Sequence, residues 1–116
     1  MSGIEKLLIT VAKLREPETG CPWDIEQTFE SLSPCVVEEA YEVSDAIANK
    51  DYENLKEELG DVLLQVIFQA EIANETELFN FDEIVDSLNN KLIRRHPHVF
   101  AGASKPLSTR EQTQAW

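Results

Sequence analysis

Segment 62–70 reads VLLQVIFQA and constrains the fold more than any other part of the sequence. Its residues are apolar almost all round a helix, so a helix that contains them must be buried on several sides. Apolar residues also recur at intervals of three and four elsewhere in the chain, which predicts further helices. The chain has 116 residues, enough for a single core. We therefore expect one all-α domain over residues 1–116, an antiparallel bundle of about four helices that is completed by dimerisation.

The first helix is predicted over about residues 3–15, from apolar residues spaced three and four apart. Pro17 and Gly20 stop it. The following stretch 16–33, EPETGCPWDIEQTFESLS, shows no clear period. Irregular segments of this length are uncommon in compact domains and are often functional, so we expect a functional loop here.

The second and third helices are predicted from their end signals. Ser33 is a good N-cap and Pro34 suits the first helical position, so the second helix should begin there and run to about Ala48. Asp51 should cap the third helix, which continues to about Asn74. Because the turn between the two helices is short, we expect them to be antiparallel neighbours.

The fourth helix should begin at Asn80, which forms a capping-box pattern with Glu83, and end near Arg95. It ends there because Pro97 restricts the residue before it. From about residue 97 we expect a loop-like tail. The last residues 109–116, TREQTQAW, resemble the opening of a further helix, and we expect the chain to end within it.

The charge of the chain excludes some classes of partner. The formal net charge is −12, which argues against general attraction to nucleic acid or to an anionic membrane. No apolar run approaches the roughly 18 residues that span a bilayer. The N-terminal MSGIEKLLITVAKLRE is charged throughout and lacks the three regions of a signal peptide. We expect a cytoplasmic protein.

Acidic residues form two motifs that helical spacing brings together. Glu38, Glu39 and Glu42 form E-E-x-x-E on one arc of the second helix, and Glu58 and Asp61 form E-x-x-D on its antiparallel partner. Taken alone, either motif is most simply a solvated helix face. Together they favour a metal site between two facing helices. The ligands are all carboxylates, which favours Mg²⁺ or Mn²⁺ over zinc or a di-iron centre and suggests a phosphorylated substrate.

Two further features could bind such a substrate. Lys91, Arg94 and Arg95 concentrate positive charge near the end of the fourth helix. Cations there can offset the helix macrodipole, but beside a metal site they can also clamp phosphate. Trp23 in CPWD is either a core aromatic under a loop or a face on which a nucleobase stacks.

Four motifs in order resemble the MazG family of nucleoside triphosphate pyrophosphohydrolases, and specifically the N-terminal half of its two-domain members: GCPWDIEQTF, EEAYE, KEELGDVLLQVIF and KLIRRHPHVF. The resemblance covers about residues 1–100. It implies an all-helical dimer that hydrolyses nucleoside and deoxynucleoside triphosphates between the α and β phosphates with Mg²⁺. The family's metal ligands fall on Glu39, Glu42, Glu58 and Asp61, with Glu38 completing the motif, and its basic residues fall on Lys91, Arg94 and Arg95.

We expect Glu38 to be catalytic, because it lies next to the metal ligands and could orient water or accept its proton. The longer members of the family carry a second, similar domain that is often the more active one, and we expect a single domain over residues 1–116. The alternative is therefore a catalytically weak nucleotide-binding, regulatory or dimerisation domain of the same fold. Dimerisation is expected because Leu64 and Phe68 lie away from the Leu63 and Ile67 side of the third helix, which leaves more apolar surface than one small bundle hides.

Overall fold

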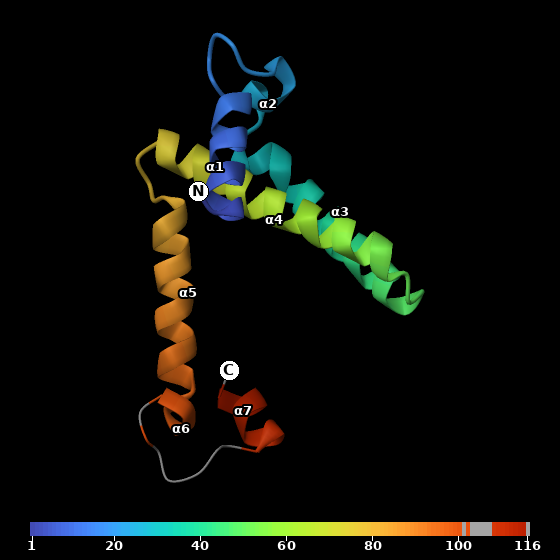
Figure 1. The fold of residues 1–116 in the computed structure, drawn as a ribbon, viewed down its shortest axis with the longest axis vertical. Coiled ribbons are helices and arrows are strands. Elements are labelled where there is room, and N and C mark those ends of the chain that lie inside the picture. Colours follow the sequence, from blue (N-terminus) through green and yellow to red (C-terminus); the bar gives the residue numbers. More distant parts are fainter. Residues whose placement is uncertain (101, 103–107, 116) are drawn as a thin grey trace. The chain divides into compact units, whose positions relative to one another are not determined.

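The computed structural model describes residues 1–100, 102 and 108–115, and all regular structure within them is helical (Figure 1). The expected all-α class is confirmed. No helix among these residues is long and apolar enough to span a membrane. The chain divides into two compact units, Met1–Phe81 and Asp82–Trp116. The helices are α1 (Gly3–Leu14), α2 (Pro22–Glu26), α3 (Phe29–Ala48), α4 (Tyr52–Glu75), α5 (Phe81–Arg95), α6 (Pro97–Phe100) and α7 (Thr109–Ala115).

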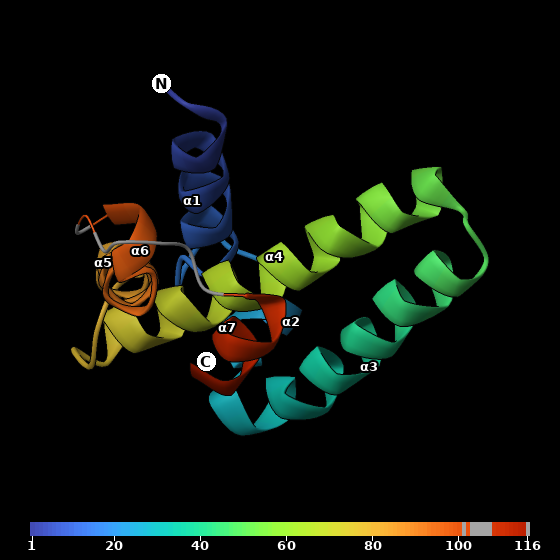
Figure 2. The same cartoon turned by 90° about the horizontal axis from the view of Figure 1, so that it is seen from below.

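Helices α3 and α4 form an antiparallel hairpin (Figure 2). The helix α3 ends at Ala48, and Lys50 turns the chain with a φ of 54°. The side chain of Asp51 then caps α4 by accepting a hydrogen bond of 3.2 Å from the backbone N–H of Asn54. The predicted turn and the predicted start of the third helix are confirmed. This turn sets the register in which the acidic residues of the two helices meet.

The predicted start of α3 at Ser33 and Pro34 is wrong. Thr28 is the N-cap, and its hydroxyl accepts from the backbone N–H of Ser31 at 3.1 Å while the Ser31 hydroxyl accepts from the Thr28 N–H at 2.8 Å. This capping box satisfies two free donors five residues earlier than expected. Pro34 therefore lies inside the helix, where it removes one backbone hydrogen bond. The preceding segment is not wholly irregular either, because it contains the short helix α2.

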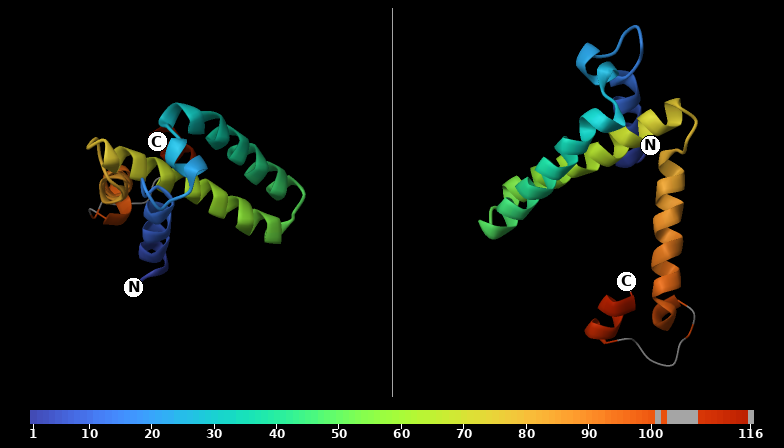
Figure 3. Two further views of the ribbon diagram at one scale, coloured as in Figure 1. Left: turned by 90° about the horizontal axis from the view of Figure 1, so that it is seen from above. Right: turned by 180° about the vertical axis from the view of Figure 1, so that it is seen from behind.

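The core of the first unit lies where α1 and α3 pack on α4 (Figure 3). The apolar stretch of α4 is thus covered on two sides, as its sequence required. The buried cluster consists of Val11, Leu32, Ile67, Phe68 and Ile72, with Leu7, Leu8, Phe29, Leu64 and Phe81 packed against it.

The expected apolar surplus exists, but on other residues. Phe68 is only 3 % exposed and Leu64 packs on the core, so the expectation that these two form a free surface is wrong. Instead Leu59, Leu63 and Val66 are exposed. Their spacing of four and three places them on one face of α4. Dimerisation remains a prediction, now with this face as its candidate surface.

Arg15 joins the end of α1 to α2 and α4. Its Nη2 atom lies 2.7 Å from Oε2 of Glu75, and its Nη1 donates to the carbonyl oxygens of Asp24 at 2.6 Å and Gln27 at 3.1 Å. The guanidinium also lies 5.4 Å from the centre of the Phe68 ring. One side chain therefore fixes the segment that carries α2 against the core.

Gly20 allows the chain after α1 to fold back closely. Its N–H donates to the Glu16 carbonyl at 2.8 Å, and the N–H of Cys21 donates to the Leu14 carbonyl at 2.9 Å. A Cβ atom at residue 20 would overlap both carbonyl oxygens. Only glycine fits this approach without a shift of the backbone.

In the second unit, α5 ends at Arg95 as predicted, and the helix begins directly after Asn80. The expectation of a loop-like tail from residue 97 is wrong for residues 97–100, which form α6, and the predicted final helix is present as α7. Residues 101, 103–107 and 116 lie outside the described part of the tail. Gln112 of α7 donates from Nε2 to the Arg95 carbonyl at 3.0 Å, which joins α7 to the end of α5.

Candidate metal centre

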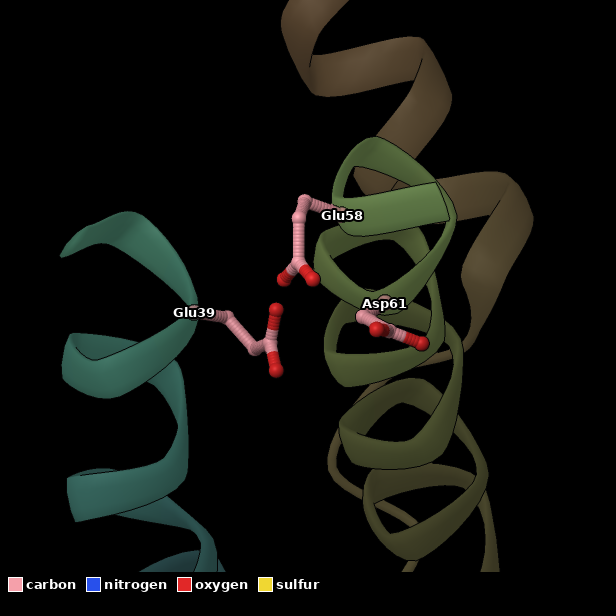
Figure 4. Close-up of side chains that lie close together, drawn as sticks. All are labelled: Glu39, Glu58 and Asp61. Carbon is pink, nitrogen blue, oxygen red and sulfur yellow. The ribbon is translucent and has the colours of Figure 1, made fainter. Parts of the chain in front are cut away.

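The hairpin brings three carboxylates together. Glu39 from α3 and Glu58 and Asp61 from α4 each place one oxygen so that the three atoms lie within 4.8 Å of one another. Figure 4 shows Glu39 reaching from α3 toward Glu58, with Asp61 beside them on α4. The spacing of three residues keeps Glu58 and Asp61 on adjacent turns of one face. We call these three residues the carboxylate cluster.

Two oxygens of the carboxylate cluster are buried and accept no hydrogen bond from the residues that the structure describes. They are Oε2 of Glu39 and Oε2 of Glu58, whereas the Asp61 side chain is exposed. A buried polar atom that makes no hydrogen bond is costly, and such atoms are rare in folded proteins. The two oxygens therefore face a position where a cation or a donor group would stabilise the fold.

The same arrangement changes the acidity of Glu39. Burial raises its pKa to about 7, assisted by the Glu58 carboxyl, to which Glu39 can donate a hydrogen bond once it is protonated, and by the negative charges of Glu58, Asp61 and Glu42. Near neutral pH Glu39 is therefore partly protonated. A divalent cation could replace that proton, since it neutralises the same repulsion.

The chemistry of the carboxylate cluster fits Mg²⁺ or Mn²⁺. All three donors are hard carboxylate oxygens on two facing helices, the ligand type that these ions prefer. The unpartnered oxygens of Glu39 and Glu58 supply acceptor positions that no donor in residues 1–100, 102 and 108–115 fills. Glu39, Glu58 and Asp61 could thus hold the ion, with other positions open for water or phosphate oxygens.

Two other predicted acidic residues lie outside the carboxylate cluster. Glu42 is exposed, but its charge contributes to the raised pKa of Glu39. It therefore lies close enough to interact electrostatically with a cation bound at the carboxylate cluster. Glu38 is also exposed and lies about 100° round α3 from Glu39. The metal-ligand role of Glu42 and the catalytic role of Glu38 remain predictions.

The structure does not bring Trp23 into the carboxylate cluster. Trp23 lies on α2 with 59 % of its surface exposed. Its segment is held through Arg15 beside Phe68 and Glu75, which follow Asp61 along α4 by about 10 and 21 Å of helix rise. Its role as a nucleobase face therefore remains a prediction from the sequence.

The three predicted phosphate ligands lie on α5, in the second unit. Lys91 and Arg95 are half-buried and Arg94 is exposed. All three are near the C-terminal end of the helix, where positive charge also offsets the macrodipole. Their role in binding phosphate remains a prediction.

The structure also shows a hollow that we did not predict from the sequence. It has a volume of about 490 Å³ and lies between the first half of α3 and Gln69 of α4. Three of its six lining residues, Phe29, Glu30 and Ser33, lie in the segment that we expected to be irregular. For this reason the hollow was not predicted from the sequence. One sequence feature nevertheless indicates a polar site on this face of α4: Gln65 and Gln69 are the two polar residues in the apolar stretch VLLQVIFQA.

Comparison with known proteins identifies the family. The sequence profile of the MazG nucleotide pyrophosphohydrolase domain matches residues 27–100, which include both acidic motifs and the basic residues of α5. The crystal structure of a mazG-related protein from Thermotoga maritima superposes with a TM-score of 0.72 at 26 % identity, over 96 % of this chain and 94 % of that one.

Curated relatives are longer proteins. The nucleoside triphosphate pyrophosphohydrolase of Escherichia coli K12 is 52 % identical over 104 residues, which are 90 % of this chain and 40 % of that protein. The nucleoside triphosphate pyrophosphohydrolase/pyrophosphatase MazG of Thermotoga maritima is 55 % identical over 96 residues, 83 % of this chain and 37 % of that protein. The chain thus spans about 40 % of the first of these relatives. Profile, relatives and fold agree that the chain belongs to the family of MazG nucleotide pyrophosphohydrolase domains.

Proposed function

We propose that the chain hydrolyses nucleoside and deoxynucleoside triphosphates between the α and β phosphates, with Mg²⁺, to nucleoside monophosphate and pyrophosphate. The observation that carries this proposal is the carboxylate cluster, with its two buried and unpartnered oxygens, in a MazG domain. The names of the relatives from Escherichia coli and Thermotoga maritima support the reaction class. Mg²⁺ is preferred because it commonly bridges a few protein carboxylates and substrate phosphates.

In this proposal Glu39, Glu58 and Asp61 bind the ion directly, and Glu42 adds negative charge or a further ligand. When bound, Mg²⁺ would polarise the phosphate oxygens and lower the pKa of the attacking water. The half-buried position of Glu39 and Glu58 limits the freedom of their carboxylates, so a bound ion would meet a fixed set of ligand oxygens.

Glu38 is proposed to accept the proton of the attacking water. It is next to Glu39 in the chain but outside the carboxylate cluster, and its exposure would let it pass the proton to solvent.

From the sequence alone, we propose that Lys91 and Arg95 offset the charge on the pyrophosphate leaving group, with Arg94 at the margin. Each role can be tested by comparing the turnover of a variant at that residue with the turnover of Asp61→Ala.

A homodimer is also part of the proposal. The exposed apolar face of Leu59, Leu63 and Val66 on α4 is more than a solvated helix needs, which supports association through this hairpin. Light scattering at micromolar concentration should give the mass of two chains.

A cytoplasmic location is proposed from the sequence alone.

The proposed reaction is tested by separating the products by ion-exchange chromatography. A panel of nucleoside and deoxynucleoside triphosphates is incubated with Mg²⁺ and either the unmodified chain or Asp61→Ala. We expect monophosphate and pyrophosphate, lost in the variant, whose circular dichroism should stay helical. Mg²⁺-dependent nucleotide binding without turnover would instead favour the regulatory or binding domain. Release of inorganic phosphate, or full activity of Asp61→Ala, would refute the proposal.

A further inference from the structure

The hollow beside α3 has a mainly apolar lining. We name it the α3 hollow, and its volume is about 490 Å³. Concave sites lined by apolar side chains with a few polar groups are typical of small-molecule binding. It is lined by Phe29, Glu30, Ser33, Val36, Val37 and Gln69.

The α3 hollow adjoins the carboxylate cluster along both helices. On α3, Val36 lines the hollow and Glu39 follows three residues later, so their side chains are neighbours on adjacent turns. On α4, Asp61 and Gln69 are joined by Gln65 at steps of four residues, which keeps the three on one face. The rise from Asp61 to Gln69 is about 12 Å, comparable to the length of the triphosphate and sugar of a nucleotide.

Gln65 lies next to the α3 hollow and has a side-chain oxygen that, within the described part of the chain, is free to accept a hydrogen bond from a ligand. Its Oε1 atom is buried and makes no hydrogen bond with any described residue. Gln65 lies between the carboxylate cluster and the α3 hollow on the same face of α4. A hydroxyl group at this turn would satisfy the free acceptor, and the sugar of a nucleotide carries such hydroxyls.

We infer that the α3 hollow binds the nucleoside part of the substrate, with the triphosphate extending along α4 to the carboxylate cluster. This inference rests on the proposed function. Phe29, Val36 and Val37 would contact the base, and Gln65 would accept a hydrogen bond from the sugar. The Gln69 amide both donates and accepts, so it can distinguish the polar edges of different bases.

The test compares ligands with and without a nucleoside. Dissociation constants are measured by calorimetry with Mg²⁺ for α,β-methylene nucleoside triphosphates, which resist cleavage, and for inorganic tripolyphosphate. We expect Val37→Gln to weaken the nucleotide analogues about tenfold while tripolyphosphate binding stays unchanged. Gln69→Leu should reduce the difference in affinity between the bases.

Ile47→Gln is the matched control, because Ile47 lies on the same helix and is as exposed as Val37, at 55 %. It should leave both ligands unaffected. Equal affinity of the unmodified chain for tripolyphosphate and nucleotide analogues would overturn the inference, as would nucleotide binding that ignores Val37→Gln and Gln69→Leu but is lost in Trp23→Ala. Absence of Mg²⁺-dependent binding of either ligand would overturn the proposed function itself, and this inference with it.

Discussion

Glu39 on α3 and Glu58 on α4 place carboxylate oxygens within 4.8 Å of each other, and each residue keeps one buried oxygen that has no donor within the described part of the chain. Two carboxylates that share a site repel each other, so a proton or a cation must join them. The register that creates this pair is set by the short turn at Lys50 and the cap at Asp51. A cation bound at this position in the hairpin would therefore be linked to the protonation of Glu39 and to the stability of the fold.

Divalent metal binding should depend on pH through Glu39. Its pKa is raised to about 7, and a metal ligand must lose its proton. Below pH 7, apparent Mg²⁺ affinity should fall by about tenfold per pH unit, and above it the affinity should level off. The affinity can be measured from the rise in melting temperature with Mg²⁺ concentration. Affinity that stays constant across this range would show that Glu39 does not bind the ion.

Without metal, Glu39 should make the fold less stable as the pH rises. Its folded-state pKa of about 7 lies above the ordinary value of 4.5, so the folded chain holds the proton more tightly than the unfolded chain. The stabilising contribution is full below pH 4.5, declines as the pH rises, and is absent above about 7. Urea unfolding with a chelator, compared between the unmodified chain and Glu39→Gln, isolates this contribution. If the difference in free energy of unfolding between the two proteins did not change with pH, the raised pKa of Glu39 would be contradicted.

Arg15→Ala should destabilise the first unit by about 2 kcal/mol, because hydrogen bonds to a charged group are lost and the partly buried carbonyl oxygens of Asp24 and Gln27 lose their donor. The Arg15 side chain is only 9 % exposed and contacts Glu75 and two backbone carbonyls. Lys56→Ala is the control, since Lys56 is 74 % exposed in its pair with Glu53. Removal of that surface pair should cost less than about 1 kcal/mol in urea unfolding. Equal costs would show that Arg15 does not join the elements as described.

Gly20→Ala and Gly60→Ala should have opposite effects. A Cβ at residue 20 would overlap backbone atoms of Leu14 and Glu16, whereas a Cβ at residue 60 meets nothing within 4 Å. Alanine inside a helix is favoured over glycine by about 0.5–1 kcal/mol, so Gly60→Ala should raise the melting temperature while Gly20→Ala lowers it. Stabilisation by both substitutions would show that residue 20 has more room than its contacts indicate.

Most of the first unit and the carboxylate cluster could be predicted from local signals. Asp51 determines the start of α4 by capping it, and the antiparallel turn follows from the short sequence before it. Given that turn, helical spacing indicates that the motifs E-E-x-x-E and E-x-x-D meet. Which of their carboxylates lie together, namely Glu39, Glu58 and Asp61 without Glu42, became clear only from the structure. The membership of the family follows from the same motifs.

The start of α3 could not be predicted so simply, because two N-terminal signals compete there. Ser33 and Pro34 form a favourable local pattern, but Leu32 is 2 % exposed in the core and favours the helix that begins at Phe29. Tertiary packing thus outweighs the cost of a proline inside the helix. The α3 hollow depends on this earlier start. The burial of Gln65 likewise depends on how α3 and α4 pack, which the sequence pattern does not specify.

The most direct test of the carboxylate cluster is to measure Mn²⁺ binding by electron paramagnetic resonance, in which the free ion gives the signal. The unmodified chain should bind Mn²⁺ saturably, and Glu58→Gln should weaken binding by at least about tenfold. Glu53→Gln, on the same helix but 89 % exposed, should bind like the unmodified chain. No saturable binding, or an equal loss in both variants, would contradict a metal centre at Glu39, Glu58 and Asp61.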